Sequence, residues 1–235
     1  MKVLALESAN EQCSVSIVDE NQELFFQLDT RAKAQTQTIL PMIEQGFLQL
    51  DIKTEDLSCI AFSRGPGSFS GVRINAAVTQ ALAWSNDLPV VPVSTLQALA
   101  QAAHRVHGLT TVTAVLDARM SEVYIASFQL DTDGIMQAVD EEQLLSYAAA
   151  TECTPFTLVG SGATLIDPSQ IQYKDLSTTA QDIATIARKN AQQQHWVSAE
   201  LALPVYLRDN AWKKIPEQGK ACLLYTSPSP RDVEE

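Results

Sequence analysis

Short apolar runs alternate with helical patterns along the first part of the chain. Continuous or alternating apolar residues predict strands over 3–6, 13–18 and 24–28. Apolar residues at helical spacing then predict a helix over about 34–50, in which Pro41 should cause a kink or a later start. Because strands and helices go on alternating, the pattern favours an α/β fold with a largely parallel sheet covered by helices.

A glycine-rich loop joins a predicted strand over 59–62 to a predicted helix over 72–84, and residues 63–73 read SRGPGSFSGVR. Glycines and serines at such a place let backbone amides approach an anion, or let two backbones pack closely. A strand over 90–93 and a helix capped by Ser94 follow. One face of the 72–84 helix is apolar or small, which fits the core and a contact surface equally: Ile74, Ala77, Val78, Ala81 and Leu82.

The second half of the chain repeats the pattern of the first. An apolar strand over 112–116 ends at Asp117 and is followed by an alternating strand over 122–129, as the strand over 3–6 ends at Glu7 and is followed by a second strand. We therefore predict a duplicated fold with lobes at 1–108 and 109–219. A weak helix near 141–150, a strand over 156–159 and a helix near 179–192 complete the second lobe. Residues 220–235 have no apolar periodicity and are predicted to be a non-native tail.

Composition narrows the function classes. The chain has 235 residues and a formal net charge of −12, which argues against a protein that binds nucleic acid unaided. No apolar run reaches the ~18 residues of a membrane span, and the N-terminus lacks the features of a signal peptide. The four cysteines show no CxxC spacing, so we expect buried thiols and a reducing, cytoplasmic location.

Two acidic residues at the predicted strand tips are the main candidates for chemistry. Glu7 and Asp117 stand where a two-lobed ATPase holds a hydrated metal and the phosphates of its nucleotide. However, the turns that follow them contain no glycine, and the loop with Gly65 and Gly67 lacks the lysine of a phosphate-binding loop. We therefore predict only a vestigial nucleotide site at these four residues, with no catalytic set, no metal site and no cofactor.

Four segments resemble one family. They are residues 3–8 (VLALES), 65–74 (GPGSFSGVRI), 116–119 with 122–124 (LDAR with EVY) and 204–208 (PVYLR). The chain is similar in these segments to the TsaB family, also called YeaZ. The resemblance implies an actin-like, Hsp70-like and sugar-kinase-like fold of two related lobes. It also implies a role in forming N6-threonylcarbamoyladenosine at position 37 of bacterial tRNA. In that role the chain would be a non-catalytic scaffold for the related transferase TsaD, together with the ATPase TsaE, and would meet tRNA only indirectly.

The resemblance also bears on metal binding and on the partner surface. The catalytic relative binds metal through two histidines, and this chain has Thr95 and Leu99 at the matching positions, neither of them a suitable ligand. Two alternatives remain open at this stage, an ATP-dependent phosphotransferase or ATPase and a metallopeptidase of the glycoprotease type. Family members form homodimers, or heterodimers with TsaD, through helices of the first lobe. Carried onto this chain, the expected partner-binding residues are Ile39, Ile43, Phe47, Ile74, Val78, Ala81 and Leu82.

Overall fold

The computed structural model describes residues 1–32 and 34–208, so the predicted tail at 220–235 lies outside the described residues. A five-stranded mixed sheet forms from the first part of the chain, with the strand order β3-β2-β1-β4-β5. Strands β1, β2 and β3 are antiparallel neighbours, whereas β4 and β5 run parallel to β1. The bounds are β1 Val3–Glu7, β2 Cys13–Val18, β3 Glu23–Asp29, β4 Cys59–Gly65 and β5 Val90–Ser94.

The second sheet repeats this pairing plan. β6 is antiparallel to β7 and parallel to β10, as β1 is antiparallel to β2 and parallel to β4. β8 and β9 both pair with β7, in the place that β3 takes beside β2. The predicted duplication is therefore present in the strand topology. The bounds are β6 Thr111–Asp117, β7 Glu122–Leu130, β8 Met136–Ala138, β9 Gln143–Ser146 and β10 Thr157–Val159.

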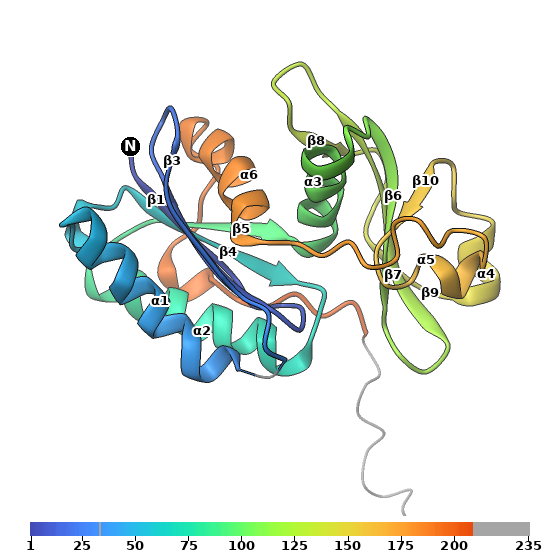
Figure 1. Ribbon diagram of the computed structural model, residues 1–235, viewed down its shortest axis with the longest axis horizontal. Helices are drawn as coiled ribbons and strands as arrows, with labels where there is room; N and C mark the ends of the chain where they lie inside the picture. Colours follow the sequence, from blue (N-terminus) through green and yellow to red (C-terminus); the bar gives the residue numbers. More distant parts are fainter. Residues whose placement is uncertain (33, 209–235) are drawn as a thin grey trace, which may run out of the picture.

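Helices form three layers around the two sheets (Figure 1). The first sheet is covered on one face by α1 (Gln35–Leu50) and α2 (Phe69–Ser85), and α4 (Tyr147–Thr151) and α5 (Ala163–Ile166) pack on the second. Between the sheets lie α3 (Thr95–His107) and α6 (Ala180–Gln192). α6 packs on β1, β2, β4 and β5, whereas α3 packs on β6, β7 and β8.

Each central helix thus covers a sheet formed by the other half of the chain. The inner face of the first sheet, with Val3 and Val91, buries Ile183 and Ile186 of α6. Leu96 and Leu99 of α3 lie in the core of the second sheet. The predicted boundary at residue 108 does separate the strands of the two sheets, but as a division into folding units it stays a prediction. No helix of the described residues is long and apolar enough to cross a membrane.

Local predictions were wrong at three places. The expected helix near 141–150 is β9 followed by the short helix α4. α2 starts at Phe69, ahead of the predicted start, because the Ser68 hydroxyl accepts a hydrogen bond from the Gly71 amide and caps the helix. Cys153 is exposed, although Cys13 and Cys59 are buried as expected. Pro41 lies inside α1 without ending it.

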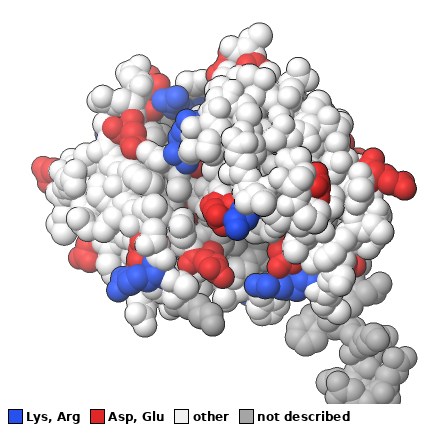
Figure 2. Space-filling view, turned by 45° about the vertical axis from the view of Figure 1, so that its right-hand side comes forward, with Lys and Arg blue, Asp and Glu red and all other residues white. Residues whose placement is uncertain are grey.

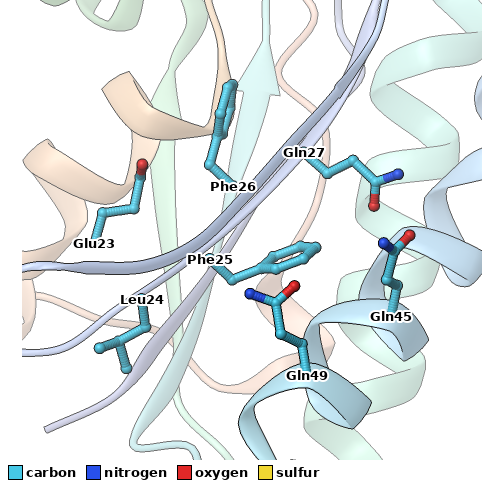
Figure 3. Close-up of a pocket in the computed structure, with 7 residues that line it drawn as sticks. All are labelled: Glu23, Leu24, Phe25, Phe26, Gln27, Gln45 and Gln49. Atoms are coloured by element: carbon cyan, nitrogen blue, oxygen red, sulfur yellow. The ribbon is translucent and has the colours of Figure 1, made fainter.

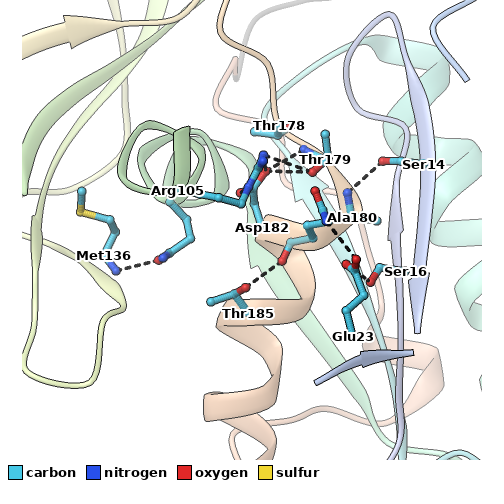
Figure 4. Close-up of polar contacts among 12 residues, drawn as sticks. Ser14, Ser16, Glu23, Arg105, Met136, Thr178, Thr179, Ala180, Asp182 and Thr185 are labelled. Carbon is cyan, nitrogen blue, oxygen red and sulfur yellow. Dashed lines mark hydrogen bonds and ion pairs between the residues drawn. The ribbon is translucent and has the colours of Figure 1, made fainter. Parts of the chain in front are cut away.

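A partly buried ion pair joins the two central helices (Figure 4). Arg105 of α3 meets Asp182 of α6 through two nitrogens, with N···O distances of 2.8 and 3.0 Å. The Asp182 side chain is fully buried, and it also accepts a hydrogen bond from the Thr179 amide at the start of α6. Asp182 therefore caps α6 and fixes it against α3 at the same time.

We expect Asp182→Ala to lower the free energy of unfolding by about 2–3 kcal/mol, because the change removes a helix cap and a buried ionic partner together. Urea denaturation followed by circular dichroism measures the loss. Asp133→Ala is the matched control. Asp133 is an exposed residue that pairs with Lys189 of α6, so its loss should cost less than about 1 kcal/mol. Equal losses in the two variants would contradict the structural role of Asp182.

Candidate functional site

The glycine loop between β4 and α2 lies directly against the turn that follows β1. The Ser68 amide donates a hydrogen bond to the Ala9 carbonyl at 2.7 Å, and the Ser8 hydroxyl donates to the Gly71 carbonyl at 2.9 Å. A Cβ atom at Gly67 or Gly71 would collide with the backbone of Ala9 or Ser8. Of the two uses that the sequence left open, the glycines therefore serve close packing of two backbones.

Both candidate carboxylates are held by their own turns. Glu7 is buried, and its carboxylate accepts a hydrogen bond from the Ala9 amide at 2.6 Å. Burial raises the pKa of the Glu7 carboxyl to about 7, and hydrogen bonding offsets only part of this effect. Asp117, in the other sheet, accepts a hydrogen bond from the Arg119 amide and pairs with the Arg119 side chain at 3.1 Å.

The structure brings three of the four predicted nucleotide-site residues together. Glu7 ends β1, Gly65 ends the neighbouring parallel strand β4, and Gly67 lies in the loop that follows, against Ala9. Gly65 has a φ of +100°, in the region that favours glycine. Asp117 lies at the end of β6 in the second sheet. The vestigial nucleotide site at these residues stays a prediction.

The two positions that match the metal-binding histidines of the catalytic relative are buried. Thr95 and Leu99 lie in α3 and are 2% and 0% exposed. Among the described residues, no group of three or more His, Cys, Asp or Glu side chains could hold a metal ion.

Two of the predicted partner-binding residues belong to the core. Ile39 and Ile43 are 1% and 4% exposed and pack beneath α1 against the first sheet, so they cannot meet a partner. Helical spacing identified them as apolar positions but could not tell which side of the helix faces the sheet. The other five keep some exposure: Ala81 is exposed, while Phe47, Ile74, Val78 and Leu82 are half-buried against the same core.

The outer face of α2 carries two large exposed residues that the sequence reasoning missed, Phe69 and Trp84. Phe69 and Trp84 are 64% and 66% exposed, and Ala77 and Ala81 lie on the same side of the helix at spacings of three and four residues. Arg73 is the single charged residue among the 17 of α2. On α1, Leu40 and Leu48 also point outward, at 54% and 76% exposure. The lack of charge along α2 was a signal available in the sequence.

A depression of about 410 Å³ lies between the edge strand β3 and α1 (Figure 3). The side chains of Gln27, Gln45 and Gln49 line it together with Phe25. Its one carboxylate, Glu23, already accepts hydrogen bonds from Ser16 and Gln181. None of the predicted site residues lines this depression.

The topology and the comparisons together define the class of protein. Two mixed sheets with the same strand-pairing plan, covered by helices, give the duplicated α/β fold that the sequence pattern predicted. The family model described as "TsaD: tRNA N6-adenosine threonylcarbamoyltransferase" matches residues 29–214.

Individual relatives narrow the class to one family. The TsaB protein of Escherichia coli K12, a "tRNA threonylcarbamoyladenosine biosynthesis protein", is 37% identical over 92% of this chain and 99% of its own length. The Haemophilus influenzae protein of the same name is 33% identical over 92% of this chain and 98% of its own. The structure of YeaZ from Pseudomonas aeruginosa, at 32% identity, matches 88% of this chain and 99% of that chain with a TM-score of 0.79. The chain belongs to the TsaB family.

Replacing Gly71 tests the close contact of the two backbones. We expect Gly71→Ala to destabilise the protein by at least about 2 kcal/mol, because the added methyl group must displace the backbone at Ser8. Ser70→Ala, at the neighbouring exposed position, should stay within about 0.5 kcal/mol. Thermal and urea unfolding measure both, and a neutral Gly71→Ala would show that the loop has room to move.

Glu7 should make stability depend on pH. Its pKa is raised in the folded state, so the stability it contributes is complete below about 4.5 and is lost as the pH rises through about 7. Relative to Glu7→Gln, the wild type should lose about 2 kcal/mol between pH 5.5 and pH 8. Urea unfolding across that range measures the difference, with the exposed Glu55→Gln as control. Parallel pH profiles for wild type and Glu7→Gln would contradict the effect of burial on this carboxyl.

Proposed function

We propose that the chain is a non-catalytic scaffold subunit in the synthesis of threonylcarbamoyladenosine in tRNA, and that it binds the transferase TsaD through the outer face of α2. Membership of the TsaB family supports the pathway, since its relatives carry that biosynthesis in their names. The binding surface is argued from the helix itself.

The composition of α2 is the observation that carries this proposal. A surface helix normally turns charged residues toward water. α2 instead exposes Phe69, Ala77, Ala81 and Trp84, with Arg73 as its single charge. Large apolar side chains beside small ones allow a second helix to approach closely and to bury them. The same face includes Ala81, the exposed member of the residues that the resemblance assigned to partner binding.

The contacts around the glycine loop favour a scaffold role and argue against an ATPase. A nucleotide phosphate at the turn after β1 would need free backbone amides at residues 8–10. There the Ala9 amide already donates to Glu7, and the Ala9 carbonyl accepts from Ser68. For the metallopeptidase alternative, Leu99 offers no ligand atom, and it is buried in the core of the second sheet.

The remaining partners follow from the same role. We infer that TsaE joins the assembly, that the chain pairs with itself when TsaD is absent, and that it acts in the cytoplasm. Contact with tRNA would be indirect, because phosphate binding needs a basic surface. On the face drawn in Figure 2, acidic groups lie beside the basic ones, in keeping with the net charge of −12.

A single substitution tests the binding face. We expect Ala81→Glu to weaken binding to TsaD at least about tenfold, because it places a charge in the middle of an apolar contact. Calorimetry with purified TsaD measures the affinity, and a tRNA modification assay should show a matching loss.

Ala148→Glu is the matched control, since it makes the same change at an exposed position of α4 in the second lobe. It should bind TsaD as the wild type does. The proposed function fails if wild-type protein does not bind TsaD, or if modification proceeds equally well without this chain.

A further inference from the structure

Two ion pairs reach from the first sheet across to the second. Arg64, at the carboxyl end of β4, pairs with Glu142 just ahead of β9, with an N···O distance of 3.0 Å. Arg208 pairs with Glu122, the first residue of β7, at an N···O distance of 2.6 Å. The four side chains are only 15–31% exposed, so solvent screens these pairs less than it screens pairs on the open surface.

The segment that carries Arg208 is fastened to the first sheet. Residues 197–208, orange-red in Figure 1, leave that sheet and run toward the second. Val197 exchanges two backbone hydrogen bonds with β5, at 2.8 and 2.9 Å, and the Val205 amide donates to the Arg64 carbonyl at 2.8 Å. The backbone of Arg64 therefore holds the segment that carries Arg208, while its own side chain reaches the second sheet.

Arg208 also holds the turn between β6 and β7. Residues 119–121 of that turn all have positive φ angles, of 61°, 55° and 61°, although none of them is glycine. A backbone in this region is strained and persists only where its surroundings hold it. Arg208 contacts the turn on both sides, because its guanidinium donates to the Ala118 carbonyl at 3.1 Å and pairs with Glu122.

These contacts lie away from the helices that join the two sheets. α3 and α6 form the central layer, where Arg105 and Asp182 meet. Two packed layers can rotate about such a centre by a hinge or shear motion, as the domains of many proteins do when they close around a ligand. Arg64 and Arg208 instead act at the carboxyl ends of β4 and β6. A contact at the edge resists rotation more than a contact at the pivot, because its lever arm is longer.

We propose that the two ion pairs form a latch that locks the two sheets in one relative orientation. This interlobe latch consists of Arg64, Glu142, Arg208 and Glu122. It makes the chain a rigid body in which closure of one sheet toward the other is blocked. The inference goes beyond the proposed function, because it concerns a motion of the chain alone and makes no use of the outer face of α2.

Distances between spin labels test the latch. Nitroxides at the exposed Cys153 and at Asn21→Cys, in an exposed turn of the first sheet, report the separation of the two sheets by double electron–electron resonance. Cys222→Ser leaves Cys153 as the native attachment site, since Cys13 and Cys59 are buried. Dilution with unlabelled protein removes distances between copies. The latched chain should give one narrow distance distribution.

Charge reversal should open the latch. Arg64→Glu and Arg208→Glu each set like charges against a carboxylate, and together they should widen the distance distribution at least about twofold. Glu142→Arg added to Arg64→Glu restores opposite charges and should bring the distribution back toward the wild-type width. This pair suits the exchange, because among the described residues neither side chain makes another hydrogen bond or ion pair.

Arg31→Glu is the matched control. It reverses an exposed arginine whose partner, Asp29, lies in the same part of the first sheet, so the width should not change. Circular dichroism checks that each variant is folded. If a reversed variant does not fold, Arg64→Gln with Arg208→Gln removes both pairs without repulsion and should still widen the distribution.

A broad distribution in the wild type, or a wild-type width in the folded charge-reversed variants, overturns the inference. Neither result bears on the binding of TsaD, which Ala81→Glu tests separately at α2.

Discussion

The contact between the glycine loop and the turn after β1 fixes much of the first lobe. Two backbones meet there without intervening side chains, because Gly67 and Gly71 leave room for Ala9 and Ser8. The Ser68 hydroxyl then starts α2 at that point. The place of α2 on the sheet, and hence the face it turns outward, follows from this contact. In the same turn, the Ala9 amide, a donor that a phosphate would need, already donates to the Glu7 carboxylate.

The two buried carboxylates near the centre of the molecule have opposite environments. Asp182 is compensated by the bidentate contact with Arg105 and by the Thr179 amide, so it can join α3 to α6 as an ion. Glu7 has no cationic partner among the described residues, and burial therefore dominates its pKa. In a nucleotide-binding protein a metal would supply that positive charge. Here the carboxyl at this position instead organises the turn that receives the glycine loop.

The sequence allowed the strands to be predicted well, because an apolar run of β-forming residues such as 59–62 has few alternatives. It predicted less well where a helix has two apolar sides. Ile39 and Leu40 are adjacent and both apolar, but only the position of the sheet decides that the first is core and the second is exposed. The start of α2 depended on a serine cap, and β9 was too short for periodicity to identify. Of the candidate site, the acidic tips were visible in the sequence, while the packing of Gly71 against Ser8 depends on topology.

Because α6 comes from the second half of the chain but packs on the first sheet, the order of translation matters for folding. All five strands of that sheet have been synthesised once residue 94 is added, but the helix that buries their inner face ends at Gln192. Roughly 100 further residues are therefore added before the helix that covers this apolar sheet face is complete. Neither lobe can complete its core alone, because each takes a helix from the other half of the chain. A nascent chain halted before α6 would leave the inner face of the first sheet exposed, as a surface that chaperones recognise.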